Sequence, residues 1–238
     1  MVRAAPVVAQ VAAALPQIAP PPPASAGEAA SGLRALVARY LAWRGGPALE
    51  QLETLHERFY LEDPGRPSPG QLWIDREGQT RRQIDRAAGR EIEVATPEGG
   101  WRVGADGAAV DVPGAYERAR RFAALEFGDA FRGRSGATVG PAPPVQVNEH
   151  DWAVVRIRFG DADVYDALVD PGAGFLGGYV ITEGGDQRTL LFGDWRMVDG
   201  VRIPFAQLTK TDPPIELRLA VVELNRPIDP ALFARPVA

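Results

Sequence analysis

The chain lacks cysteine altogether and has no excess of positive charge. Without cysteine it can form no disulfide, thiolate nucleophile or cysteine-based zinc or iron–sulfur site. This absence does not define the compartment, because exported proteins can also lack cysteine. The 26 basic residues are outnumbered by 31 acidic ones, which leaves a net charge of −5. We therefore expect no nucleic-acid partner, since binding to a phosphate backbone requires a basic surface.

Histidine is also scarce, and the acidic residues do not form a recognisable metal motif. His56 and His150 are far apart and lack metal-ligand spacing, so we interpret them as surface or core residues. Four aspartates gather around one predicted turn without the pattern of a calcium-binding loop, and we interpret them as turn and surface residues. These are Asp161, Asp163, Asp166 and Asp170. The sequence therefore predicts no metal site.

A glycine-rich segment at 172–177 matches G-x-G-x-x-G letter for letter. A dinucleotide fingerprint needs a helix directly after it, so that the pyrophosphate meets the helix N-terminus. Here the residues 178–182 include the β-branched run Val180-Ile181-Thr182 and read as a strand, so we interpret the glycines as a hairpin turn and expect no cofactor. No nucleophile elbow or P-loop occurs, and no pair of carboxylates is singled out for acid–base work. We therefore expect a protein that is not an enzyme.

The amino terminus has the order of a secretory signal. An apolar stretch at 4–15 precedes a proline tract, and Ala24-Ser25-Ala26 is a small-x-small triplet that suits cleavage after Ala26. An Ala/Pro-rich disordered leader is the alternative. We assign residues 1–30 to this leader and 31–238 to one domain. Because no apolar run reaches the ~18 residues needed to cross a bilayer, we predict no transmembrane span.

The body of the domain reads as a β-rich meander with few helices. The 26 glycines and 22 prolines favour many short strands joined by turns. We predict an amphipathic helix from Ser31 to the glycine pair at 45–46, a short helix from Pro47 that includes Leu52 and Leu55, and a third helix over 116–131. The linker at 133–144 is interpreted as a loop or flap. The predicted strands are 57–61, 71–75, 79–84, 91–95, 101–103, 152–159, 164–169, 178–182, 189–197, 201–208 and 215–224.

Two carboxy-terminal segments carry a family resemblance. Residues 192–205 include a Val-Asp-Gly turn before Ile203-Pro204, and residues 222–236 follow the pattern v-x-l-N-x-p-x-d-x-x-l-F-x-x-P. Both segments resemble the LolA/LolB-like outer-membrane lipoprotein-sorting domains. The resemblance implies an α+β fold, a single curved antiparallel sheet forming an incomplete barrel, with helices covering its concave apolar face. The acylated LolB-type receptors are excluded because this chain has no cysteine.

This resemblance implies a periplasmic, non-catalytic protein, which we expect to be a monomer. It would bind a lipid or lipoprotein acyl chain between sheet and helices. The alternative is a packed sensor domain, similar to the RseB/MucB regulators, that contacts an envelope protein partner. Alternating apolar residues predict a continuous apolar sheet surface, which is either a cavity or a packed core. The predicted lining residues are Leu36, Tyr40, Leu72, Ile74, Phe122, Val155, Ile157, Tyr179 and Ile181.

Overall fold

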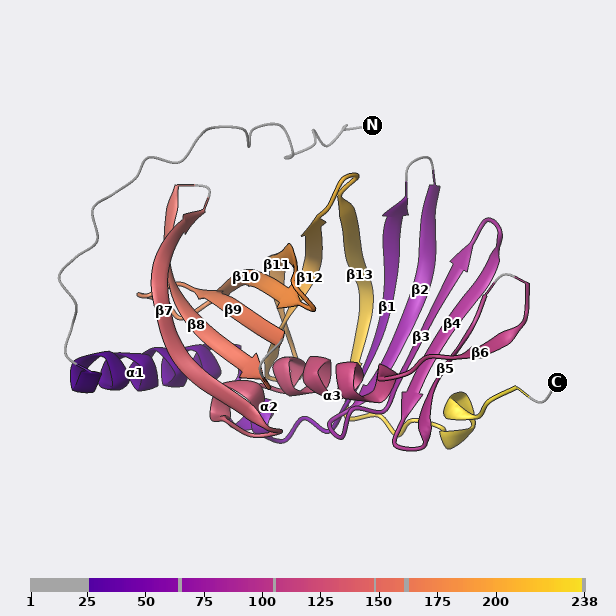
Figure 1. The fold of residues 1–238 in the computed structure, drawn as a ribbon, viewed down its shortest axis with the longest axis horizontal. Coiled ribbons are helices and arrows are strands. Elements are labelled where there is room, and N and C mark those ends of the chain that lie inside the picture. The colour runs from indigo at the N-terminus through magenta and orange to yellow at the C-terminus, as the bar shows by residue number, and fades with distance from the viewer. Residues whose placement is uncertain (1–25, 64–65, 105, 148, 161–162, 237–238) are drawn as a thin grey trace.

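The computed structural model describes residues 26–63, 66–104, 106–147, 149–160 and 163–236. Its thirteen strands form one antiparallel sheet in the order β6-β5-β4-β3-β2-β1-β13-β12-β11-β10-β9-β8-β7. The two outermost strands, β6 and β7, do not pair with each other, so the curved sheet stays open (Figure 1). The strands are β1 (Thr54–Asp63), β2 (Arg66–Asp75), β3 (Thr80–Arg86), β4 (Gly89–Thr96), β5 (Gly99–Val103), β6 (Ala109–Asp111), β7 (Ala137–Val147), β8 (His150–Phe159), β9 (Asp163–Val169), β10 (Leu176–Glu183), β11 (Asp186–Val198), β12 (Val201–Lys210) and β13 (Ile215–Leu224).

Three α-helices cover the concave face of this sheet, which confirms the predicted fold class. They are α1 (Ala26–Arg44), α2 (Pro47–Glu50) and α3 (Ala115–Glu126), and two 3₁₀ turns are η1 (Ala130–Arg132) and η2 (Pro230–Phe233). In Figure 1, α3 crosses the hollow of the sheet, and α1 lies beside β7. None of the described helices is both long and apolar enough to cross a bilayer.

Three helix boundaries differ from the prediction. Helix α3 ends at Glu126 rather than at residue 131, because Gly128 adopts a positive φ of 74° and the chain continues into the separate 3₁₀ turn η1. Helix α1 begins at Ala26, so Ser31 lies inside it and does not cap it; the residues 28–30 that extend it are Glu-Ala-Ala, which are good helix formers. Helix α2 ends at Glu50, and Leu55 instead belongs to β1, where it pairs with Ile74. Most of the predicted leader, residues 1–25, lies outside the described residues.

The predicted linker at 133–144 is also wrong, because most of it belongs to β7. This strand pairs only with β8 and forms one edge of the sheet. Its three prolines, at 141, 143 and 144, cannot donate a ladder hydrogen bond, which an edge strand tolerates. The register shifts between Ala142 and Val145, at the Pro-Pro pair. The prolines therefore led to the prediction of a loop where the structure has a strand.

The interior has two hydrophobic clusters, one in each half of the sheet. The first joins α1 to β7–β11 and centres on buried residues such as Tyr40, Val155 and Leu176. The second joins α2 and α3 to β1–β3, β12 and β13 around residues such as Leu52 and Phe127. The carboxy-terminal half of α3 contributes to both clusters, so this helix holds the two halves together.

The end of α1 docks against the turn between β11 and β12. This turn is the predicted Asp199-Gly200 pair, with φ of 45° and 85°, the left-handed values of a tight hairpin turn. Arg202 donates a hydrogen bond to the carbonyl of Trp43 at the end of α1. Gly45 follows with φ of 148°, and a Cβ atom there would lie 2.6 Å from the Gly200 oxygen. Only glycine fits this junction.

We therefore expect Gly45→Ala to lower the free energy of unfolding by about 2–4 kcal/mol, from positive-φ strain and overpacking together. Urea denaturation followed by far-UV circular dichroism measures this loss. Gly140→Ala on β7 is the matched control, because a Cβ atom there meets nothing within 4 Å. Equal stability of the two variants would contradict this account of the junction.

Candidate ligand-binding site

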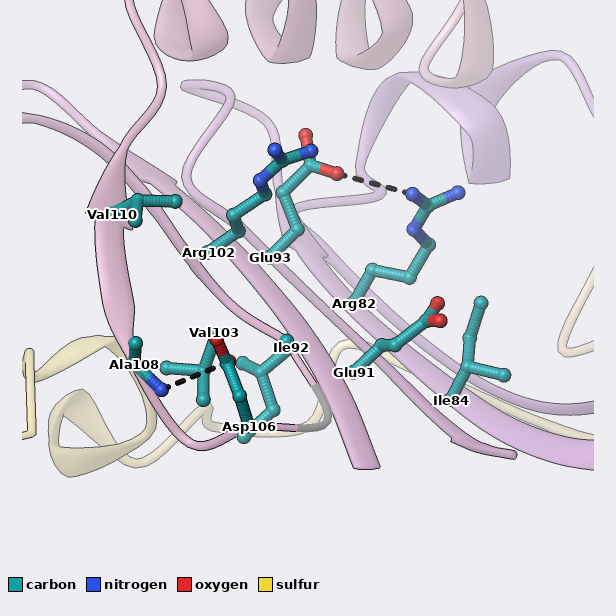
Figure 2. Close-up of a pocket in the computed structure, with 11 residues that line it drawn as sticks. Arg82, Ile84, Glu91, Ile92, Glu93, Arg102, Val103, Asp106, Ala108 and Val110 are labelled. Atoms are coloured by element: carbon teal, nitrogen blue, oxygen red, sulfur yellow. Dashed lines mark hydrogen bonds and ion pairs between the residues drawn. The ribbon is translucent and has the colours of Figure 1, made fainter. Parts of the chain in front are cut away.

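One row of side chains crosses the concave face from β1 to β5. Strand pairing aligns Glu57 with Leu72, Leu72 with Arg82, Arg82 with Glu93, and Glu93 with Arg102. Figure 2 shows the last three of these side chains reaching from the sheet toward the helices. The predicted continuous apolar surface is therefore wrong in this half, where charged residues interrupt it.

The convex side of β4 and β5 is buried, which explains why charged residues lie on the concave side. On the face away from the helices, Val94 is fully buried and Trp101 is 6% exposed. The carboxy-terminal segment covers that face, and Arg81 donates a hydrogen bond of 2.9 Å to the carbonyl of Leu232 there. These two strands thus bury their convex side chains, which leaves their concave side chains free to be polar.

A cavity of approximately 300 Å³ lies between this row and α3, and we call it the α3 cavity. Its size is at the lower end of the range for small-molecule sites. Its apolar lining comes from both sheet and helix, and Phe122 on α3 is 39% exposed although it is a large apolar residue. The lining residues are Glu57, Phe59, Leu72, Thr80, Arg82, Glu93, Ala95, Ala115, Arg118, Ala119, Phe122, Gln207 and Leu217.

A second hollow of approximately 400 Å³ continues from the α3 cavity along β3–β6 (Figure 2). The two share Arg82 and Glu93, whose side chains form an ion pair of 3.1 Å. Both side chains are substantially exposed, so this pair contributes about 1 kcal/mol or less to stability. The pair thus marks a polar mouth, whereas the apolar surface lies deeper, under α3.

Glu57 is the unusual member of the α3 cavity. It lies on the same face of β1 as Leu55 and Phe59, both buried, and is itself only 6% exposed. Burial, followed by the negative charge of Glu126, raises the pKa of Glu57 to about 8, against an opposing effect of Arg44. The carboxyl is therefore mostly uncharged at neutral pH.

A buried polar network links α1 to α3 close to Glu57. Arg44, 2% exposed, forms an ion pair of 3.5 Å with Glu126 and donates a hydrogen bond of 3.2 Å to the Glu126 carbonyl. Its guanidinium also lies 3.5 Å from the Tyr40 hydroxyl and 5.5 Å from the centre of the Trp195 ring. Burial raises the pKa of Tyr40. The network fixes the ends of two helices over the middle of the sheet.

The nine predicted lining residues fall into three groups. Leu72 and Phe122 line the α3 cavity. Ile74 lies in the second hydrophobic cluster, and Leu36 packs partly buried against the first. The remaining five are buried in the first cluster, and their role as ligand contacts stays a prediction. These five are Tyr40, Val155, Ile157, Tyr179 and Ile181.

The histidines lie on the sheet with separate partners. His56 stacks on Trp73 and lies 2.9 Å from the Glu223 carboxylate, whereas His150 lies 2.9 Å from that of Asp170. Among the described residues, no three His, Asp or Glu side chains gather as a metal site requires.

The four aspartates of the predicted turn region do not act as one cluster. Asp163 pairs with Arg121, and Asp166 pairs with Arg156 on the neighbouring strand. The Asp170 side chain accepts a hydrogen bond of 2.9 Å from the backbone of Gly172 and so shapes the turn before β10. Asp161 lies outside the described residues.

Sequence reasoning missed the polar members of the site, above all Glu57. The signal was present, because an acid stands between Leu55 and Phe59 at a position where strand alternation requires an inward side chain. The cross-strand pairing of Arg82 with Glu93 also follows from a hairpin centred on residues 87–88. The approach of α3 to this row depends on long-range packing that no local pattern encodes.

No protein-family model matches this sequence, and no curated protein matches it. Solved structures do match in fold. A LolA superfamily protein from Nitrosomonas europaea aligns with a TM-score of 0.57 at 10% identity, over 85% of this chain and 97% of its own. A putative outer membrane lipoprotein-sorting protein domain from Vibrio parahaemolyticus gives 0.54 at 10% identity, over 86% and 97%. A DUF1329 family protein from Desulfovibrio piger gives 0.57 at 8% identity, over 85% and 97%. Together with the open antiparallel sheet and its helices, these matches show that the chain has the LolA-like fold.

Proposed function

We propose that this protein is a non-catalytic periplasmic carrier that binds a lipid or an acyl chain in the α3 cavity. The observation that carries the proposal is the cavity itself, with apolar side chains on both the sheet and α3. Phe122 supports it most directly, because so large an exposed apolar side chain is stabilised when a ligand covers it. The fold shared with an outer membrane lipoprotein-sorting domain is consistent with a lipid ligand and with the periplasm.

Binding to this cavity draws on apolar burial of about 25 cal/mol per Å². The charged mouth at Arg82 and Glu93 opens to water, and the apolar chain lies under α3. No residue of the cavity is assigned a catalytic role. The alternative of a packed sensor domain that binds an envelope protein stays a prediction.

Blocking the cavity tests this function. Ala119 on α3 lines the cavity and is half-buried, so Ala119→Trp places an indole in the ligand space. We expect at least a tenfold loss of affinity for a fluorescent fatty acid, dansyl-aminoundecanoic acid, in a fluorescence titration. Competition with unlabelled dodecanoate checks that the dye reports the chain rather than the dansyl group.

Ala88→Trp is the matched control, because Ala88 is exposed in the turn between β3 and β4. It should bind like the unmodified protein, and circular dichroism should show that both variants are folded. If the unmodified protein binds no apolar chain, whether a fatty acid, an alcohol or an amine, the proposed function fails. Equal binding by Ala119→Trp would place the ligand elsewhere.

A further inference from the structure

Glu57 occupies a position where an apolar residue would suffice for packing. Its neighbours across the ladder are Leu72 on β2 and Val222 on β13, and neither side chain can donate a hydrogen bond. Among the described residues, no side chain or backbone group forms a hydrogen bond or ion pair with its carboxyl. Glu57 as a whole is 94% buried, and a buried carboxyl without a partner is destabilising. It lines the α3 cavity, so a ligand in the cavity can reach it.

The charges around Glu57 indicate which ligand group suits it. Arg44, the cation whose charge lowers the pKa of Glu57, is already paired with Glu126 at 3.5 Å, so the buried end of the site holds two acids and one base. The negative charge of Glu126 raises the pKa of Glu57 by more than the positive charge of Arg44 lowers it. The deep end of the cavity therefore favours a positive charge that donates hydrogen bonds.

The remaining charges of the cavity belong to its mouth. Arg82 is paired with Glu93, and its side chain is 54% exposed. Arg118 is exposed on α3 and donates a hydrogen bond of 3.1 Å to the carbonyl of Pro113. Solvent screens both arginines, so they repel a buried cation only weakly.

Resting on the proposed function, we propose that the α3 cavity binds an amphiphile with a protonated amine on an apolar chain, its ammonium group paired with the carboxylate of Glu57. The chain then lies against Phe59, Leu72 and Phe122. Glu57 is mostly protonated at neutral pH in the empty site, so forming the ion pair sends its proton to solvent. Binding of one ammonium ligand thus releases close to one proton.

Three probes with the same chain, dodecylamine, dodecanol and dodecanoate, test this specificity below the micelle concentrations of the two ionic probes and the solubility limit of dodecanol. Isothermal titration at pH 7 should show dodecylamine binding about 10- to 100-fold tighter than dodecanol, the range of a charge-assisted hydrogen bond. Repeating it in two buffers of different ionisation enthalpy should show release of close to one proton with dodecylamine. Dodecanol should release none.

Glu57→Gln keeps the shape of the side chain and removes its charge. It should bring dodecylamine to the affinity of dodecanol and abolish the proton release. Glu62→Gln, on the exposed face of the same strand, should retain both. Dodecanol binding without a preference for dodecylamine, or a preference that survives Glu57→Gln, would overturn the amine specificity and leave the carrier function intact. Failure of all three probes to bind would overturn both.

Discussion

Replacing Arg44 with methionine is expected to lower the free energy of unfolding by about 3–5 kcal/mol, because it leaves the Glu126 carboxylate without its cation. The Arg44 side chain is 3% exposed and that of Glu126 is 15% exposed, so water compensates little. Methionine keeps most of the volume, so the effect reports charge rather than a cavity. For a chain of this size the loss corresponds to a melting temperature lower by roughly 6–20 °C, which calorimetry measures.

A second substitution distinguishes the loss of the ion pair itself from the cost of leaving the Glu126 carboxylate buried without a cation. Arg44→Met combined with Glu126→Leu should recover most of the lost stability, because two apolar residues often replace a buried ion pair without loss. Arg90→Met serves as the control, since its partner Asp85 lies 2.6 Å away in a largely exposed pair. That variant should lose about 1 kcal/mol or less. A similar loss for Arg44→Met would mean that the buried network contributes little.

The sheet was largely predictable because its signals are local. Alternating apolar residues and Gly-containing turns located eleven of the thirteen strands, including the hairpin at Asp199-Gly200. The exceptions are β7, disguised by its prolines, and the three-residue β6, which is too short to show alternation. Local patterns of this kind depend on backbone geometry that each residue type favours by itself.

The candidate site was less predictable because it depends on distant segments. Arg44 and Glu126 are 82 positions apart, and neither stands out in a sequence with many arginines and glutamates. Long-range packing decides whether a given face of a strand is covered by a helix, by the carboxy-terminal segment or by solvent. On the paired strands β3 and β4, Arg82 lies on the concave face and is exposed, whereas Val94 lies on the convex face and is buried. Glu57 is predictable only in part. Strand alternation places its side chain inward, but its position in the α3 cavity and its raised pKa depend on α3 and Glu126, which are distant in the sequence.

Glu57 also makes the stability of the protein depend on pH in a direction opposite to that of a salt-bridged acid. Its pKa is about 8 in the folded protein, against 4.5 for an ordinary glutamate. Below pH 4.5 both folded and unfolded chains hold the proton, so it has no effect on stability. Between pH 4.5 and 8 only the folded chain holds it, so stability falls as pH rises, by about 1.4 kcal/mol per pH unit. The total loss at pH 8 is roughly 4–5 kcal/mol.

Glu57→Gln removes this titration while keeping the other ionisable groups. The stability of the variant relative to the unmodified protein should therefore rise steadily from pH 4.5 to pH 8 and level off above it, as measured by urea denaturation at half-unit steps. Taking this difference cancels the titration of every group common to both proteins. Glu62→Gln should give a flat difference, because its side chain is exposed. A flat difference for Glu57→Gln as well would show that water reaches the carboxyl, and the cavity would then be wetter and less suited to an apolar chain.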